Sequence, residues 1–257
     1  MKNKTFVKCE KTPLVCVVQA ATPDRIKELA DKAISEGAEA FGMQFCKLDD
    51  KFRNRKTYKE LFEYVSPLPT YVTNYRSYGS NKDKNDDALV MELVEIAECG
   101  ATLCDVMGDY FDRCDDELTM NPDAIDKQIK LIDELHKRGA EVLMSSHVKK
   151  FIPAERVLEI ALEHQRRGAD VSKIVTGAAT MEEQIENLRI TNLLKEKLNI
   201  PFLFLSCGES YIVRRLGATF GNCMTLCVCE YDELATSAQP LLSDMMEIRK
   251  LFAANKD

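Results

Sequence analysis

The sequence lacks the features of several large classes of protein. No apolar run approaches the roughly 18 residues that a membrane-spanning helix requires, so we expect no membrane insertion. The formal net charge is −7 and there is no basic block, which argues against nucleic acid as a partner. No Pro-, Gly- or Ser-rich linker divides the 257 residues. One globular domain with a sizeable core is the simplest interpretation.

Metal-binding patterns are also missing. The chain has ten cysteines but no CxxC pair, and only three histidines to complete a ligand set. Several cysteines fall in predicted strands, where a free thiol behaves as a small hydrophobic side chain. We therefore predict reduced, mostly buried thiols in a cytoplasmic protein, with no bound metal and no other cofactor.

Apolar runs of strand length alternate with helical patterns along the whole chain. We expect strands at residues 14–19, 38–45, 70–74, 102–107, 141–145, 171–176, 202–206 and 223–228. We expect helices at residues 23–36, 56–64, 86–99, 122–138, 153–167, 181–198, 210–216 and 240–253. Four helix-to-strand joints repeat the pair Gly-Ala, which suits a left-handed helix cap followed by a tight turn into the sheet.

Eight strand–helix units in about 250 residues are typical of a (β/α)8 TIM barrel. An open doubly wound sheet is the alternative. Such sheets usually carry a Gly-rich dinucleotide loop, and neither GxGxxG nor a P-loop occurs here. We therefore predict a single α/β barrel domain over residues 1–257, in which residues 1–12 form a polar N-terminal arm.

Lys173 lies inside an apolar run, residues 171–175 (VSKIV), that otherwise reads as a buried strand. Burying an ammonium group costs several kcal/mol or more, and a lowered pKa relieves that cost. Lowering the pKa turns the group into an amine nucleophile that can form an imine with a carbonyl. The alternative is a lysine that extends past the strand end to water. Asp105, within the fourth strand, would be costly if buried unpaired, so Lys173 or a hydrogen-bond network is its plausible partner.

His147 follows the fifth strand, and Lys173 lies in the sixth. In a barrel these strands are neighbours, and their carboxyl ends carry the active site. A histidine next to the amine would supply the proton transfers that imine chemistry requires. A hydrogen-bonded loop histidine is the alternative for His147. His136 and His164 fall near the ends of polar helices, where we expect solvated surface positions.

Further candidates for substrate binding come from the other strand ends. Arg76 ends the third strand, and Arg214 and Arg215 follow the seventh. Arginine forms two parallel hydrogen bonds with a carboxylate, so any of these could hold an acidic substrate, although a surface ion pair is the commoner role. Ser237 and Gln239 are small polar groups just before the last helix.

Together these residues resemble the type I 3-dehydroquinases, over almost the whole chain from Pro13 to about Leu251. The most specific stretch is His147 followed by residues 168–174 (GADVSKI), which is similar to the family's catalytic histidine and its GADxxKI segment with the Schiff-base lysine. The run at residues 214–221 is similar to the family's S-R-L-x-G-x-x-F-G, and it implies that Arg215 binds the substrate carboxylate.

The resemblance extends to other strand ends. Arg76 and Asp105 match the family's arginine after strand 3 and aspartate in strand 4. Ser237 and Gln239 resemble the serine and glutamine of the closing loop, at a shorter spacing.

The sequence departs from the family at several recognition positions. Where the family has Glu-Trp-Arg after strand 2, this chain has Gly42-Met43-Gln44, so Gln44 is the polar group expected to contact the substrate there. Val17 stands where some members have a substrate-binding serine, and Met107 replaces an acid in strand 4. Each lost polar contact forfeits about 1–3 kcal/mol.

The resemblance implies a class I aldolase-like barrel and a metal-independent dehydratase, which is a carbon–oxygen lyase. In the family, this reaction converts 3-dehydroquinate to 3-dehydroshikimate, a step of the shikimate pathway and of aromatic amino acid biosynthesis. Lys173 would form the imine and His147 would act as general acid and base. The expected partner is a small carboxylated keto substrate, and a homodimer is possible because family members are often dimers.

Three hypotheses follow from the sequence. The first is a dehydroquinate dehydratase with an altered pocket. The second is a Schiff-base lyase or aldolase of the same superfamily acting on a different, less hydroxylated keto acid. The third is a non-catalytic relative that binds a small acid, against which the buried amine argues.

Overall fold

The computed structural model describes residues 5–9, 11–76, 78–208 and 211–254. The strands are β1 Leu14–Val18, β2 Ala40–Gln44, β3 Thr70–Thr73, β4 Leu103–Met107, β5 Glu141–His147, β6 Val171–Ala178, β7 Phe202–Gly208 and β8 Thr225–Cys227. The α-helices are α1 Pro23–Ser35, α2 Arg55–Tyr64, α3 Asp86–Glu98, α4 Pro122–Lys137, α5 Ala154–Arg166, α6 Met181–Lys197, α7 Ile212–Phe220 and α8 Leu242–Ala254. Three single-turn 3-10 helices are η1 Phe45–Lys47, η2 Asp50–Phe52 and η3 Gly79–Asn81.

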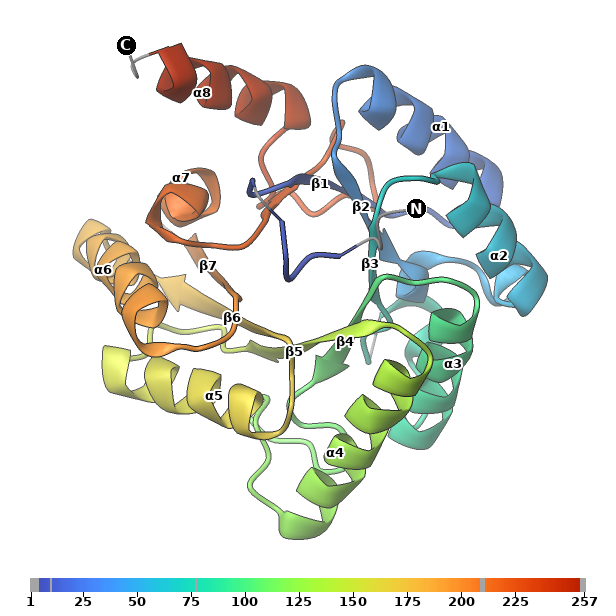
Figure 1. Cartoon of the computed structure of the whole chain (residues 1–257), viewed down its shortest axis with the longest axis horizontal. Helices are drawn as coiled ribbons and strands as arrows, with labels where there is room; N and C mark the ends of the chain where they lie inside the picture. Colours follow the sequence, from blue (N-terminus) through green and yellow to red (C-terminus); the bar gives the residue numbers. More distant parts are fainter. Residues whose placement is uncertain (1–4, 10, 77, 209–210, 255–257) are drawn as a thin grey trace.

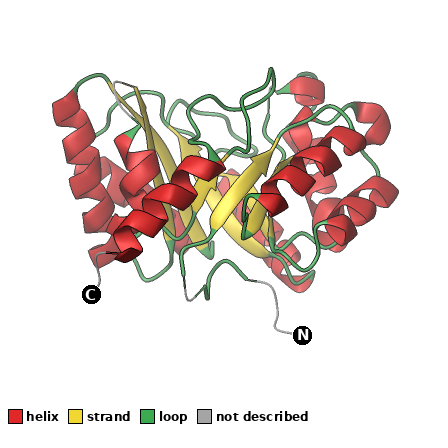
Figure 2. Ribbon diagram, turned by 90° about the horizontal axis from the view of Figure 1, so that it is seen from above, coloured by secondary structure: helices red, strands yellow, loops and turns green. Residues whose placement is uncertain are grey.

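All eight strands belong to one parallel sheet, in the order β7-β6-β5-β4-β3-β2-β1-β8. The sheet curls around a central axis, and the α-helices surround it (Figure 1). Seen from the side, the strands occupy the middle of the molecule with helices on both flanks (Figure 2). The predicted (β/α)8 barrel architecture is confirmed. Strand β6 extends two residues beyond its expected end, and the helix expected from residue 210 begins at Ile212, with Ser210 outside the described residues.

Local signals in the sequence account for where several helices begin. The side chains of Thr22, Asn54, Asn85, Asn121 and Thr180 each accept a hydrogen bond from a backbone N–H in the first turn of the helix that follows. Among the helices in the described ranges, none combines the length and the apolar character that crossing a bilayer would demand.

The barrel interior and its exterior form separate apolar clusters. Side chains of alternate strand residues fill the interior, as shown by Val15, Leu103, Leu143 and Val171, while the opposite faces of the strands pack against the helices. Two residues further along the inward face of β6, Val171 is followed by Lys173. The apolar layer therefore lies directly beneath a layer that carries polar groups.

The N-terminal segment is less polar than the sequence suggested. Phe6 is buried and packs in the interior cluster, and its backbone N–H donates to Glu141 (2.7 Å). The prediction of a polar arm is wrong at this residue, because its aromatic ring is buried in the interior cluster. Residues 1–4 and 10 of the expected arm lie outside the described residues.

The sheet edges β7 and β8 meet through a side chain. Within the described residues no strand ladder joins them, and the Asn222 side chain instead bonds both backbone groups of Phe204 (N–H to Oδ1 2.8 Å, Nδ2 to O 2.8 Å). Gly217 makes room for this side chain, because a Cβ there would lie 2.2 Å from the Asn222 amide nitrogen. One backbone bond, from the Cys223 N–H to the Phe202 carbonyl (2.9 Å), completes the junction.

Candidate active site

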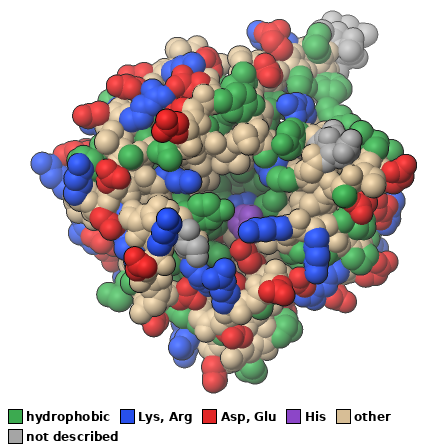
Figure 3. Space-filling model, turned by 180° about the vertical axis from the view of Figure 1, so that it is seen from behind, with side chains coloured by type: hydrophobic (Ala, Val, Ile, Leu, Met, Phe, Trp, Pro, Cys, Tyr) green, Lys and Arg blue, Asp and Glu red, His purple; other side chains and the backbone are tan. Residues whose placement is uncertain are grey.

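A cavity of about 280 Å3 opens at the carboxyl ends of the strands. Figure 3 shows this hollow at the centre of one face, with a histidine side chain inside it and Lys and Arg side chains around its mouth. Strands and loops from around the barrel contribute to its wall, which includes Val17, Gln19, Gly42, Gln44, Lys47, Tyr71, Thr73, Tyr75, His147, Lys173, Val175, Leu205, Arg214, Leu226 and Gln239. The structure thus brings Lys173 and His147 to one cavity, as predicted.

Lys173 is buried on the inward face of β6, with an exposed fraction of 4%. Its Nζ donates to the Tyr71 hydroxyl (2.9 Å), the Tyr75 hydroxyl and the Asp105 carboxylate (3.2 Å). Burial lowers the pKa of Lys173, and this effect outweighs the attraction of Asp105, which raises it. The alternative of a lysine that reaches out to water is excluded by these contacts.

Asp105 is the acidic partner of Lys173 and of the two tyrosine hydroxyls. Its carboxylate accepts hydrogen bonds from Ser145 (2.5 Å), Tyr75 (2.5 Å) and Tyr71, in addition to the ion pair with Lys173. Burial raises the pKa of Asp105, but the charge of Lys173, the nearby His147 and the hydrogen bonds from Ser145 and Tyr71 together lower it by more, so the net shift is downward and the carboxylate stays ionised. The predicted partnership of Asp105 with Lys173 is confirmed.

His147 is the last residue of β5 and has a carboxylate partner that the sequence did not reveal. Its Nδ1 lies 2.7 Å from Glu117 Oε2, and its backbone N–H donates to the same oxygen (2.9 Å). An ionised carboxylate only accepts hydrogen bonds, so Nδ1 carries the proton and Nε2 of the neutral ring is left as a base. Burial raises the pKa of Glu117, and the hydrogen bond and charge of His147 lower it below its usual range.

Glu117 reaches His147 from the loop between β4 and α4. Its backbone φ is +45°, an unusual value for a residue other than glycine, asparagine or aspartate. The Ser146 hydroxyl donates to the Glu117 carbonyl (2.8 Å), and the Glu117 N–H donates to the Cys114 carbonyl (3.2 Å). These bonds hold the residue in its strained conformation, which is a feature common at functional sites. No periodic pattern marks such a loop residue, so it could not be identified from the sequence.

Arg214, and not Arg215, lines the cavity. The Arg214 side chain is 6% exposed, and it donates to the Ser206 carbonyl (3.0 Å) and to Gln239 Oε1 (3.1 Å). Arg215 lies outside the cavity lining, with its guanidinium over the ring of Tyr211. The assignment of the carboxylate-binding position to Arg215 is therefore corrected by one residue. Successive residues on a helix point about 100° apart, so such a shift decides which arginine faces the site.

Arg76 also points away from the cavity. It forms a two-bond ion pair with Asp86 (2.8 Å each) and contacts Asp109 (3.1 Å) behind the sheet. The inward direction at the end of β3 belongs to Tyr75, because Tyr71, Thr73 and Tyr75 share one face. The expectation that Arg76 contacts substrate is corrected. Its role in the structure is to anchor the segment after β3 to α3 and to the β4–α4 loop.

Of the remaining predicted polar residues, some line the cavity and one does not. Gln44 Oε1 accepts a hydrogen bond from Gln19 Nε2 (2.7 Å), and both glutamines line the cavity. Gln239 is held at the mouth by Arg214. Ser237 is outside the lining, and the neighbouring Thr236 takes its place by donating to Gln19 Oε1 (2.8 Å from N, 3.1 Å from Oγ1).

The wall formed by β1, β2 and β3 is closely packed around Gly42. A Cβ at Gly42 would lie 3.2 Å from Val17 Cγ2 and 3.6 Å from Tyr71 Cδ1. The space into which a side chain at position 42 would project is therefore occupied by these two neighbours. Val17 and Gly42, the two positions that depart from the family pattern, therefore pack together with the ring of Tyr71.

His164 is buried, contrary to the expectation of a surface position. It lies between the Ser146 and Ser172 hydroxyls (3.0 Å each), on the side of β5 and β6 that faces α5. Burial and the nearby Arg167 lower its pKa to about 3, so the ring is neutral. The two serines satisfy the imidazole, which explains how a polar side chain fits beneath this helix. His136 is exposed as expected and pairs with Asp170 (2.8 Å).

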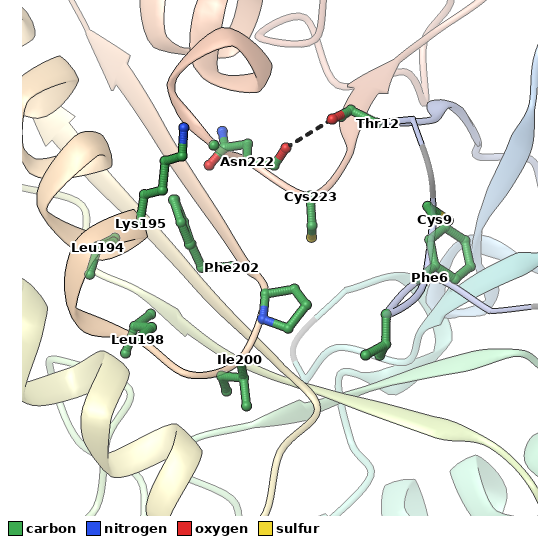
Figure 4. Close-up of a pocket in the computed structure, with 13 residues that line it drawn as sticks. Phe6, Cys9, Thr12, Leu194, Lys195, Leu198, Ile200, Phe202, Asn222 and Cys223 are labelled. Atoms are coloured by element: carbon green, nitrogen blue, oxygen red, sulfur yellow. Dashed lines mark hydrogen bonds between the residues drawn. The ribbon is translucent and has the colours of Figure 1, made fainter.

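A second cavity, of about 330 Å3, lies at the amino ends of the strands. Figure 4 shows Phe6 and Cys9 of the N-terminal segment facing Leu194 and Leu198 of α6 across it, and a hydrogen bond from Thr12 to the Asn222 carbonyl (3.4 Å). In barrels the chemistry belongs to the opposite end. Among the described residues, no group of three or more His, Cys, Asp or Glu side chains could hold a metal ion.

A family model for type I 3-dehydroquinase matches residues 15–256. The chain belongs to this family. The 3-dehydroquinate dehydratase of Klebsiella pneumoniae (strain 342) is 28% identical over 233 residues, which cover 88% of this chain and 87% of that protein. The enzyme of the same name from Listeria monocytogenes serotype 4a (strain HCC23) is 31% identical over 99 residues, so the match spans 38% of this chain and 39% of the length of that relative.

Solved structures of dehydratases have the same fold. The 3-dehydroquinate dehydratase of Geobacillus kaustophilus HTA426 superposes with a TM-score of 0.83 at 15% identity, covering 99% of this chain and 97% of the other. The type I enzyme of Clostridium difficile gives a TM-score of 0.80 at 20% identity, covering 99% of both chains.

Proposed function

We propose that this type I 3-dehydroquinase family member is a Schiff-base-forming dehydratase of 3-dehydroquinate or a related cyclic keto acid. The observation that carries the proposal is the buried Lys173 amine in one cavity with the His147–Glu117 pair. Such an enzyme is a carbon–oxygen lyase. We expect it to work in the reducing environment of the cytoplasm.

The residues divide the work as follows. Lys173 gives up a proton to His147, and its amine attacks the ring ketone to form a carbinolamine. His147 returns the proton to the carbinolamine oxygen, which leaves as water and gives the iminium. Neutral His147 then removes a proton from the adjacent carbon, and the iminium nitrogen takes the electron pair. The protonated ring assists the β-hydroxyl to leave as water, and hydrolysis frees Lys173.

Glu117 stabilises His147 each time the imidazole holds the extra proton. Arg214, with Gln239 beside it, is the carboxylate-binding group that we propose in place of Arg215. The guanidinium is fixed by the Ser206 carbonyl (3.0 Å), which leaves it little freedom to reorient.

A second candidate substrate is a less hydroxylated keto acid. Val17 and Gly42 favour it, because these residues offer no partner to ring hydroxyls at positions where the family pattern has polar groups. Gln44 is the polar group that remains on β2, and it is already bonded to Gln19.

Borohydride trapping with 3-dehydroquinate, followed by intact mass and peptide mapping, tests the proposal. We expect a reduced adduct on Lys173 and turnover to dehydroshikimate. An adduct without turnover would favour the second substrate class. If neither dehydroquinate nor a panel of keto acids gives an adduct, the imine mechanism is wrong and the protein is a binding relative. His147→Gln should still give the adduct, although more slowly because its proton transfers in imine formation are lost, and it should slow dehydration by about 100-fold or more.

A further inference from the structure

Two phenols, Tyr71 and Tyr75, lie against the Lys173 amine, and the mechanism above uses neither. Both hydroxyls accept a hydrogen bond from Nζ and both donate to Asp105, and their oxygens are 3.3 Å apart. The amine is therefore held by both hydroxyl groups, and Lys173, Tyr71 and Tyr75 all line the cavity.

The two tyrosines differ in where they stand. Tyr71 is 2% exposed, and its ring packs in the interior cluster as well as lining the cavity. Tyr75 is half-buried at the carboxyl end of β3, and its ring meets His147 edge to face, with centroids 5.1 Å apart and planes at 82°. Tyr75 is the more exposed of the two phenols, so we expect a carbonyl that approaches Nζ to meet its hydroxyl.

The other groups near the amine cannot exchange two protons in one step. Asp105 is ionised and only accepts. In the described part of the chain no hydrogen bond joins His147 to Lys173. A neutral phenol has one proton to give and lone pairs that can receive another. Burial and the charge of Asp105 raise the pKa values of both phenols well above their usual value, which keeps them in this neutral form.

We propose that Tyr75 is a further catalytic residue, which transfers the proton of the attacking Lys173 nitrogen to the substrate oxygen during carbinolamine formation. This inference rests on the imine mechanism. The N–C bond forms as the C=O π pair moves to oxygen, which gives an ammonium and an alkoxide. The Tyr75 O–H protonates the alkoxide while its oxygen receives a proton from the ammonium. Tyr75 ends neutral, and water loss and all later steps are left to His147.

The matched pair Tyr75→Phe and Tyr71→Phe tests this assignment. Each removes one hydroxyl that contacts both Lys173 and Asp105, and Tyr75→Phe keeps the ring against His147. The readout is the rate at which a borohydride-reducible adduct forms in rapid-quench experiments, with any keto acid that the wild-type protein traps. Tyr75→Phe should slow this step by about 100-fold, and Tyr71→Phe by less than about 10-fold. The conversion of preformed imine to product should change by less than about threefold in Tyr75→Phe.

Other outcomes overturn the inference. Adduct formation at the wild-type rate in Tyr75→Phe excludes the transfer, and equal losses in the two variants point to support of the Lys173–Asp105 pair instead. The wild-type solvent deuterium isotope effect on adduct formation gives a check that needs no variant, and its absence contradicts the transfer. If the wild-type protein traps no keto acid, the proposed function fails and the inference fails with it. A failure confined to Tyr75→Phe leaves the proposed function standing.

Discussion

The two halves of the cavity follow different rules. On the β4–β6 side, His147 and Lys173 line the cavity, and the Asp105 carboxylate bonds both the Lys173 amine and the Ser145 hydroxyl. On the β1–β3 side, the wall is built by packing, and Gly42 is set by the bulk of its neighbours. The comparison indicates that the two sides meet at Tyr71, whose hydroxyl bonds the Lys173 amine and whose ring occupies the space beside Gly42.

Removing the Lys173 amine should have the largest effect, on both activity and stability. Lys173→Met should abolish borohydride trapping and turnover. It should also lower the free energy of unfolding by about 3–5 kcal/mol, because Asp105 is left buried without its cation. Urea unfolding measures the stability term. Lys173→Met combined with Asp105→Asn is the control, and it should recover part of the loss; a double variant as unstable as the sum would contradict the pairing.

The arginine pair tests the correction made at α7. Arg214→Met should raise KM for a carboxylated keto substrate by about 10- to 100-fold, since a hydrogen bond to a charged group contributes about 1.5–3 kcal/mol. Arg215→Met is the matched control and should change KM by less than about twofold. Steady-state kinetics with the substrate that the trapping experiment identifies provides the measurement. The opposite ranking would return the role to Arg215.

Introducing the family's carboxylate on β2 tests the packing around Gly42. Gly42→Glu should destabilise the protein by about 1–3 kcal/mol, because the new side chain has to displace Val17 and Tyr71. Gly42→Gln has the same shape without the charge and should cost a similar amount in thermal or urea unfolding. A large difference between the two variants would mean that charge burial, and not packing, excludes the acid.

The smallest expected effect is a pH dependence at the His147–Glu117 pair. The pKa of Glu117 in the folded protein lies below its unfolded value, so its contribution to stability is present above the ordinary glutamate pKa of about 4.3. That contribution is lost as the pH falls through the folded-state pKa. The stability difference between wild type and Glu117→Gln should therefore be larger at about pH 6 than at about pH 3.5. Glu60→Gln, at an exposed residue, should show a smaller change.

The sequence was informative where a residue's type conflicts with its surroundings. Lys173 interrupts an apolar strand, and the two-residue period of strands places Asp105 and Lys173 on inward faces. The same reasoning fails at element ends. Whether Arg76 or Tyr75 faces the cavity, and whether Arg214 or Arg215 does, changes when the register is shifted by one residue. Glu117 lies in a loop with no period, so its place beside His147 arises only from tertiary structure.

The Asn222 junction has a consequence for chain connectivity. The seven pairs of neighbouring strands are joined by backbone ladders, whereas β7 and β8 are joined by a side-chain amide and one backbone bond. A circularly permuted chain that began at β8 and ended after β7 would run through the sheet in strict spatial order, from one edge to the other. Such a rearrangement would leave every backbone ladder intact. Helix α7, which carries Arg214, would however keep its chain connection to only one of β7 and β8.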